Sequence, residues 1–335
     1  MPLKILSIIF LLAVTQISFS QDRLTEYNFK SVDSFARFVK YDNDLSKLTN
    51  TLTAPYTDSI YKLRAIFIWI TDNIEYDYKF LTKGGQAGFS CTGTKEICDA
   101  AKINYENNFV QNCLENRKGI CSGYAYLFKR MCGSTGINSD VVDGYVKVNP
   151  YQVGLLLNVS HSWNVVTVDG KNYFFDLTWA SGSCKADENG KPTAFVKYYE
   201  DYYWMLPYDK IARNHYPNNE KWIAPGMPYN KEVFFNNPFF YSAKVLSNIA
   251  VSNPESGVLT THIGDTVRFK FSYRDKINRI TINTNTKKNI EVLTTSPSSG
   301  WPNNFQFDYV VTENFLYYID IFFDGQPALR YKVKS

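Results

Sequence analysis

The sequence predicts an α+β fold, with mixed helices and strands through most of the chain and a small all-β domain at its end. Apolar residues recur at three- and four-residue spacing from Leu63 to Ile74, which is typical of a helix. An Asp169-Gly170 dipeptide separates two strand-like runs, which indicates a hairpin with a type I′ turn. Apolar and polar residues alternate through much of residues 241–335, as expected for the strands of a β-sandwich.

Residues 1–20 have the pattern of an export signal. Lys4 provides a positive start, residues 5–14 are almost wholly apolar, and small residues precede a cleavage point before Gln21. The alternative is an uncleaved membrane anchor, but a spanning helix needs roughly 20 apolar residues. We therefore expect an exported protein, whether periplasmic, cell-surface or secreted, with no stable membrane span after signal cleavage.

Composition and missing motifs exclude several kinds of partner. Hydrophobic residues make up 44% of the chain, and the net charge of +4 is too small to indicate a nucleic-acid partner. The sequence has no H-E-x-x-H, P-loop, paired C-x-x-C, G-x-S-x-G or EF-hand pattern. Its only histidines are His161, His215 and His262, and we expect a structural role for His215. We expect no cofactor and no metal, and no pattern specifies an oligomeric state.

Changes of texture along the chain predict four parts. These are a signal peptide at 1–20, a helical lead-in at 21–56, a mixed domain with a C-terminal extension at 57–240, and a β-sandwich-like domain at 241–335. The elements expected in the mixed domain are a helix starting after Thr57-Asp58, helix or loop at 98–113, a helix over 119–133, and strands at 139–148, 161–168 and 173–178.

Cys121 lies in the first turn of the helix predicted at 119–133. A cysteine attacks as its thiolate, which the unpaired N–H groups and partial positive charge of a helix N-terminus stabilise. We expect Gly119 and Gly123 to leave room for a substrate backbone, and the Cys121 N–H to donate to an oxyanion. The alternative is that Cys121 is a buried or bridged cysteine. The second oxyanion donor stays open among an aromatic N–H or O–H and the amides of Gln111, Asn112 and Asn116.

The predicted hairpin brings His161 and Asp176 together. If Asp169-Gly170 is a two-residue turn, Trp163 lies opposite Asp176, and His161 is two residues from Trp163. Residues two apart on a strand share a face, so His161 and Asp176 are diagonal neighbours on one face. Diagonal neighbours lie within reach of long side chains. A register shift of one residue would place them on opposite faces.

The three residue types have complementary roles in acyl transfer. His161 would take the thiol proton and later protonate the leaving amine, and Asp176 would hold the imidazole tautomer and favour its charged form. The alternatives are a structural strand histidine and a turn carboxylate. The joint placement of Cys121, His161 and Asp176 at a helix start, a strand and its partner strand favours a catalytic triad. Trp163 and Trp179 either line the cleft or pack in the core, and we favour the core.

Six cysteines are compatible with disulfides in an exported protein. Cys98 with Cys113 is one candidate bridge, although connectivity does not follow from sequence. Cys132 lies in an apolar helical run, which predicts a buried free thiol.

The sequence resembles the transglutaminase-like superfamily, and within it the group related to the kyphoscoliosis peptidase and its bacterial relatives. The resembling stretches span residues 64–77, 117–125, 144–147, 161–166, 173–179 and 202–222. The resemblance covers residues 57–240 and implies a papain-like fold, in which a helix bearing Cys121 packs on an antiparallel sheet bearing His161 and Asp176. It also implies acyl transfer through a thioester, and some members of the superfamily have lost activity.

Three functions follow from this reading. The first is an exported cysteine peptidase or amidase that acts on protein or peptide substrates, with water as the acyl acceptor. The second is a protein cross-linking transglutaminase, with an amine as the acceptor. The third is a non-catalytic surface binding or scaffold protein with a transglutaminase-like core, which would explain the many aromatic residues.

Overall fold

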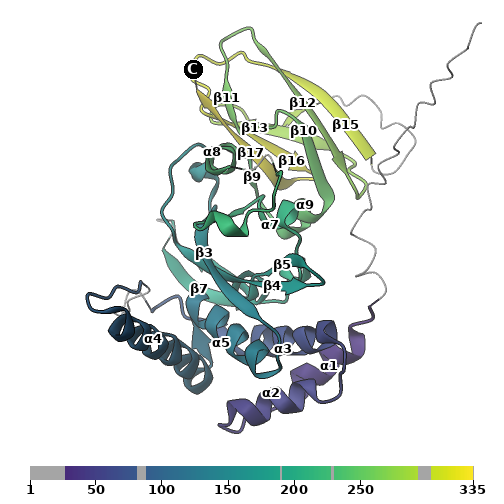
Figure 1. The fold of residues 1–335 in the computed structure, drawn as a ribbon. Helices are drawn as coiled ribbons and strands as arrows, with labels where there is room; N and C mark the ends of the chain where they lie inside the picture. The colour runs from purple at the N-terminus through teal and green to yellow at the C-terminus, as the bar shows by residue number, and fades with distance from the viewer. Residues whose placement is uncertain (1–26, 81–87, 189–190, 228–229, 293–302, 335) are drawn as a thin grey trace, which may run out of the picture.

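The computed structural model describes residues 27–80, 88–188, 191–227, 230–292 and 303–334. The predicted signal peptide, residues 1–20, lies outside these ranges. Figure 1 shows the N-terminal helices at one end of the molecule, a central sheet in the middle and the C-terminal sheets at the other end. No helix in the described ranges is long and apolar enough to cross a membrane.

The N-terminal end of the molecule is built from helices. They are α1 (Lys30–Phe38), α2 (Leu45–Thr53), α3 (Ser59–Asn73), α4 (Lys95–Asn116) and α5 (Cys121–Ser134). Asp58 caps α3, because its side chain accepts the backbone N–H of Ile60 at 2.7 Å. Residues 63–70 of α3 are at most 4% exposed, so α3 is the central helix of the core. The stretch 98–113, predicted as helix or loop, is part of α4.

The predicted hairpin is confirmed in an antiparallel sheet of order β5-β4-β3-β8. Its strands are β3 (Ser139–Val146), β4 (His161–Val168), β5 (Lys171–Phe175) and β8 (His215–Pro217). Val168 pairs with Lys171, and Asp169 and Gly170 both have positive φ, as a type I′ turn requires. Helix α5 packs on β3 and β4, and its Phe128 is fully buried. Burial of such a side chain stabilises the fold by about 1.5–3 kcal/mol.

Strand β5 is shorter than predicted. It ends at Phe175 rather than Thr178, because the chain turns at Asp176 into the short helix α6 (Leu177–Ala180). The Asp176 side chain accepts the backbone N–H of Trp179 at 3.0 Å and so caps this helix. The register that relates β4 to β5 nevertheless continues up to the Asn164–Phe175 pair, as predicted.

Residues 182–248 pack against this core as short elements. They include the hairpin of β6 (Gly182–Ala186) and β7 (Pro192–Lys197), and the helices α7 (Tyr208–Ile211), α8 (Lys231–Asn236) and α9 (Ala243–Asn248). A two-residue parallel pair, β1 (Glu75–Tyr76) with β2 (Lys118–Gly119), joins the end of α3 to the segment that leads into α5. This pair fixes the chain immediately before Cys121.

The C-terminal region forms two sheets that share one apolar core, as the alternation predicts. One sheet has the order β10 (Ile249–Asn253), β12 (Thr266–Tyr273), β15 (Asn303–Val310). The other has the order β11 (Val258–Thr260), β17 (Gln326–Lys334), β16 (Tyr318–Phe323), β13 (Ile280–Thr284), β14 (Ile290–Glu291), and β9 (Phe239–Phe240) also pairs with β17. Phe269 and Phe271 of β12 are buried opposite Phe307 and Phe305. The domain boundaries themselves stay a prediction.

Candidate active site

Cys121 lies in the first turn of α5, as predicted, although the helix begins at Cys121 itself rather than at Gly119. Ile120 precedes it in an extended conformation, and no side chain caps the helix. The first N–H groups of α5, at the Cys121 end, therefore have no partner within the helix. The Cys121 residue is 8% exposed. A helix start stabilises a thiolate, whereas burial opposes its charge.

Gly119 and Gly123 do not leave room for a substrate, contrary to the prediction. A Cβ atom on Gly119 would lie 2.3 Å from Cys113 Sγ, and one on Gly123 would lie 2.6 Å from the same sulfur. Both distances are far below a normal contact, so the space beside each glycine is filled by Cys113. The two glycines let α4 pack tightly against the start of α5.

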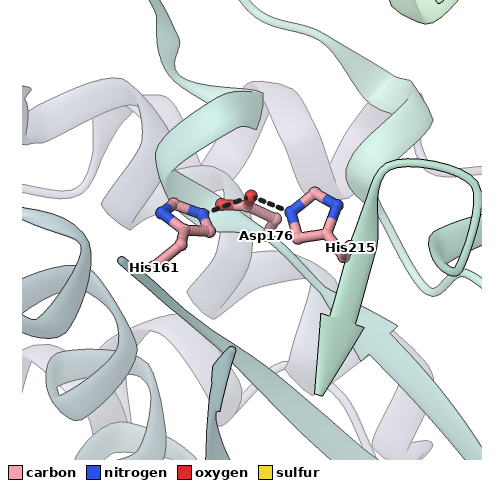
Figure 2. Close-up of side chains that lie close together, drawn as sticks. All are labelled: His161, Asp176 and His215. Carbon is pink, nitrogen blue, oxygen red and sulfur yellow. Dashed lines mark hydrogen bonds and ion pairs between the residues drawn. The ribbon is translucent and has the colours of Figure 1, made fainter. Parts of the chain in front are cut away.

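His161 and Asp176 meet as the hairpin register predicts (Figure 2). His161 is the first residue of β4, and its Nε2 lies 2.8 Å from Asp176 Oδ2. The Asp176 side chain is fully buried, and its other oxygen is held by the Trp179 N–H. The imidazole is therefore fixed through one ring nitrogen, which leaves Nδ1 for a second partner.

His215 joins the same carboxylate, which the sequence analysis missed. Its Nε2 lies 2.9 Å from Asp176 Oδ2, and its Nδ1 lies 2.7 Å from Asn214 Oδ1. Figure 2 shows the two imidazoles on either side of Asp176. His215 reaches this position because β8 pairs with β3, with Val146 opposite His215. The structural role expected for His215 is thus a role inside the site.

The charges of the site stabilise one another. Burial opposes charge on His161 and Asp176, but the carboxylate raises the pKa of the imidazole and the imidazolium lowers the pKa of the carboxyl. Burial also raises the pKa of the Cys121 thiol, but the hydrogen bond and charge of His161 outweigh burial, so that the net pKa is lowered. At His215 burial prevails and lowers the pKa, which favours the neutral ring. The site favours a thiolate beside an imidazolium.

The same cluster has donor atoms of the kind that metals bind. One ligand atom each of His161, Asp176 and His215 lies within 4.8 Å of the other two. However, the Nε2 atom of His161 and the Nε2 atom of His215 are already at hydrogen-bond distance from the same oxygen, Asp176 Oδ2. The geometry is that of a hydrogen-bonded network around Asp176.

A cleft of about 660 Å³ opens beside His161. Its walls come from the core, from the β6–β7 hairpin and from the segment that leads into the C-terminal sheets; they include Trp179, Cys184, Phe195, Tyr198, Phe240 and Leu246. Trp179 therefore lines the cleft as well as packing on the core, whereas Trp163 is buried in the core as favoured. The cleft is rich in aromatic side chains.

The three amides considered as oxyanion donors lie elsewhere. Gln111 donates to Glu115, Asn116 donates to Asn112, and Asn112 donates to the Lys118 carbonyl. These residues are on α4 and none of them lines the cleft. Of the donors predicted from the sequence, an aromatic N–H or O–H remains.

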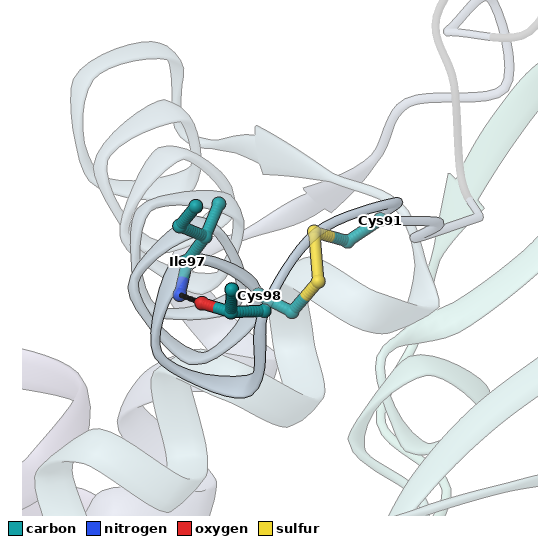
Figure 3. The surroundings of a disulfide bond; sticks show 4 residues. Cys91, Ile97 and Cys98 are labelled. Atoms are coloured by element: carbon teal, nitrogen blue, oxygen red, sulfur yellow. Dashed lines mark hydrogen bonds between the residues drawn. A yellow bond between two sulfur atoms is a disulfide. The ribbon is translucent and has the colours of Figure 1, made fainter.

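The disulfide differs from the predicted one. Cys98 is bonded to Cys91, seven residues earlier, and not to Cys113 (Figure 3). Cys98 and Cys113 lie on the same helix, where 15 residues span roughly 22 Å, so they cannot be bridged. Cys132 is a buried free thiol as predicted, and Cys113, Cys121 and Cys184 are also free.

Comparison with known proteins agrees with the geometry. A model of the transglutaminase-like superfamily matches residues 46–177, which include Cys121, His161 and Asp176. Kyphoscoliosis peptidase of Mus musculus is 26% identical over 235 residues, and the protein of that name from Homo sapiens is 27% identical; each alignment covers 70% of this chain and 32% of the relative. Hillarin of Drosophila melanogaster is 26% identical over 229 residues, or 64% of this chain and 25% of the relative.

This chain thus spans about a third of the length of the first two relatives. The match to a solved structure described as a TGase covers 54% of this chain and 38% of that structure's chain. Its sequence identity is 19% and its TM-score is 0.28. The family match, the helix start at Cys121 and the antiparallel sheet that carries His161 agree on one conclusion: residues 46–177 are a domain of the transglutaminase-like superfamily.

Proposed function

We propose that this protein is an exported cysteine peptidase or amidase, with Cys121 as nucleophile, His161 as general base and acid, and Asp176 as the orienting group. The hydrogen bond of 2.8 Å between His161 Nε2 and Asp176 Oδ2 carries the proposal. It leaves Nδ1 of His161 for the Cys121 thiol, and the charge of His161 lowers the pKa of that thiol. A histidine held this way can move a proton between the thiol and a leaving group.

The proposed reaction has two halves. The Cys121 thiolate attacks the carbonyl carbon of a peptide bond, the C–N bond breaks, and the His161 imidazolium gives its proton to the leaving amine. His161 then takes a proton from water, whose oxygen attacks the thioester carbon. The C–S bond breaks, the carboxylic product leaves, and the thiol is restored. If an amine replaces water, the same steps produce a cross-link.

The cleft supports a polypeptide substrate with a large apolar side chain. Its walls include Trp179, Phe195 and Phe240, and the Trp179 ring centroid lies 5.5 Å from that of His161. Aromatic surfaces bind apolar side chains strongly. Phe240 belongs to the segment paired with β17, so the C-terminal sheets hold one wall of the cleft. This arrangement gives the C-terminal region a part in substrate selection.

Export is supported by one covalent feature. The Cys91–Cys98 disulfide is typical of oxidising compartments outside the cytosol. With the apolar segment at residues 5–14, it favours delivery across a membrane.

Activity on a casein-derived peptide library tests the proposal. We expect new amino termini to appear with the purified protein and not with the Cys121→Ala variant. Full activity in that variant would contradict the proposal. A wild-type protein that incorporates a dansylated amine into casein and releases no hydrolysis product would establish the cross-linking alternative instead. Binding to a partner without any Cys121-dependent product would favour the scaffold alternative.

A further inference from the structure

Ser162, the residue after His161 in β4, carries a hydrogen-bond chain that leads to the helix of Cys121. Successive residues of a strand point to opposite faces of a sheet, so the Ser162 side chain points away from that of His161. Its Oγ donates to Asp143 Oδ1 at 2.6 Å and lies 3.3 Å from Ser122 Oγ. Asp143 is paired with Ser162 across β3 and β4. Ser122 directly follows Cys121 in α5, so the chain joins the strand of the base to the helix of the nucleophile.

The direction of the chain follows from its donors and acceptors. A hydroxyl has one proton to donate, and a carboxylate can only accept. Because Ser162 gives its proton to the Asp143 carboxylate, Ser122 is the donor to Ser162. Ser122 and Ser162 are buried, at 6% and 7% exposed, whereas Asp143 is exposed. Buried hydroxyls need partners, so breaking one link leaves a buried polar group unpaired.

A second contact holds α5 on the same face of β4. Asn164 lies two residues after Ser162, and its Nδ2 donates to the Ala125 carbonyl at 3.0 Å. Ala125 comes about one helical turn after Ser122 in α5. Apolar packing is non-directional, so these two polar contacts fix how the first turn of α5 is placed along β4.

The backbone of Ser162 contacts the nucleophile itself. Burial raises the pKa of the Cys121 thiol, whereas hydrogen bonds from His161 and from the Ser162 backbone N–H lower it. Hydrogen bonds weaken steeply when their angle or length departs from the optimum. Both bonds to the sulfur therefore depend on where α5 places Cys121 relative to β4, and this is the placement that the chain controls.

The other titratable groups around Cys121 do not supply this stabilisation. Asp176 raises the pKa of the thiol, as a nearby negative charge must. Three phenols also interact with the thiolate; burial raises the pKa of each, so they keep their protons. They lie on β1, α4 and α5, and are Tyr76, Tyr105 and Tyr126. A negative charge on Asp143 would likewise oppose the thiolate, so Asp143 can support it only through hydrogen bonds.

We propose that the chain from Asp143 through Ser162 to Ser122 is a second orienting device, which positions the nucleophile as the first device positions the base. The first runs from Asp176 to His161 on the other face of β4. This inference rests on the proposed function. The three side chains of the second device are positioning groups, because they act by placing the sulfur. A displacement of about 1 Å at a reacting group can cost about 100-fold in rate.

The Ser162→Ala variant tests the inference, because it removes the central hydroxyl and keeps the backbone N–H. We expect iodoacetamide labelling of Cys121 at pH 6 to slow about fivefold, the effect of one lost hydrogen bond, and kcat/KM for peptide hydrolysis to fall at least as much. At pH 9 an ordinary cysteine is also largely a thiolate, so labelling should stay within about twofold of wild type. Ser139→Ala is the matched control and should change neither rate, because Ser139 is an equally buried serine of β3 whose hydroxyl accepts the Asn164 amide.

Two changes at the exposed Asp143 separate the hydrogen bond from the charge. Asparagine keeps an accepting oxygen for Ser162, and alanine does not. We expect labelling of Cys121 at pH 6 to slow about threefold in Asp143→Ala, since water replaces part of an exposed bond, and to match wild type in Asp143→Asn. Loss of the charge alone would not slow labelling in either variant. In the double variant Ser162→Ala with Asp143→Ala the slowing should stay about fivefold, because both residues act through one chain.

The outcomes separate the inference from the proposed function. Wild-type labelling of Ser162→Ala at pH 6, or a slowing of the same size at pH 6 and pH 9, would overturn the inference and leave the proposed function intact. Multiplied effects in the double variant, about fifteenfold, would overturn it as well. If Ser162→Ala does not fold, the two Asp143 variants decide between the chain and the charge. A wild-type protein whose Cys121 is not labelled rapidly at pH 6 would overturn the proposed function, and the inference with it.

Discussion

Replacing Asp176 by Asn tests the network with the smallest change of shape. The carboxylate is fully buried and accepts three hydrogen bonds, from His161 at 2.8 Å, from His215 at 2.9 Å and from the Trp179 N–H at 3.0 Å. An amide has one accepting oxygen and one NH2 group, and it carries no charge. The amide of the Asp176→Asn variant cannot accept all three hydrogen bonds in this arrangement, and it cannot favour an imidazolium at His161.

The magnitude follows from the bonds that are lost. A hydrogen bond to a charged group contributes about 1.5–3 kcal/mol, and the bond to His161 alone then corresponds to about a 10- to 150-fold effect. We expect kcat/KM for peptide hydrolysis to fall by at least this factor. We also expect Cys121 to lose thiolate character at pH 6, because the charge on His161 that lowers its pKa is no longer supported.

Iodoacetamide alkylation of Cys121 as a function of pH, together with peptide hydrolysis, checks both expectations. The conservative control is Asp209→Asn, because Asp209 is a partly exposed carboxylate in α7 and does not line the cleft. An Asp176→Asn variant that folds, cleaves peptide and titrates at Cys121 like wild type would refute the assignment of Asp176 as the orienting group.

Three further substitutions test other parts of the account. Gly119→Ala should lower the free energy of unfolding, measured in urea, by about 1–3 kcal/mol, because the new methyl group is overpacked against Cys113. The double variant Gly119→Ala with Cys113→Ala should recover most of that loss. No recovery would contradict the packing argument. Phe240→Ala should raise KM for a leucine-containing peptide roughly fivefold, with kcat unchanged. Fivefold corresponds to about 1 kcal/mol, less than the about 1.5–3 kcal/mol of a fully buried aromatic, because a cleft wall covers the substrate side chain only in part. An unchanged KM would remove Phe240 from the cleft wall. Replacing Cys91 and Cys98 by Ser should cost about 2–3 kcal/mol in urea unfolding, as expected for a short closed loop; a cost near zero would show that the bridge is not structural.

The features that the sequence predicts well are set by neighbouring residues. Asp169 and Gly170 adopt positive φ without the strain that bulky side chains suffer, so the turn and the register of β4 with β5 follow from the dipeptide. That register brings the end of β5, which Asp176 follows, alongside the strand that begins at His161. The helix start at Cys121 is equally local, because it follows from the change of pattern after Gly119.

The features that the sequence does not predict depend on pairings between distant segments. His215 reaches Asp176 only because β8 adds to the edge of β3, and no local pattern around His215 specifies that edge. The cleft is likewise shaped by a segment near Phe240 that pairs with β17.

The central claim is that Cys121 is an activated thiolate, and alkylation by limiting iodoacetamide from pH 5 to 9 tests it most directly, with labelled peptides identified by mass spectrometry. An ordinary cysteine titrates near about pH 8.5. The pKa of Cys121 is lowered, so its thiolate should persist below that value and disappear only as the pH falls through the lowered pKa. Cys184 is the internal reference, because it is a partly exposed free thiol whose pKa is raised by burial.

The account predicts that Cys121 is labelled fast at pH 6, well before Cys184, and that His161→Ala slows this labelling. Labelling of Cys121 at the rate of an ordinary thiol, with no effect of His161→Ala, would contradict it.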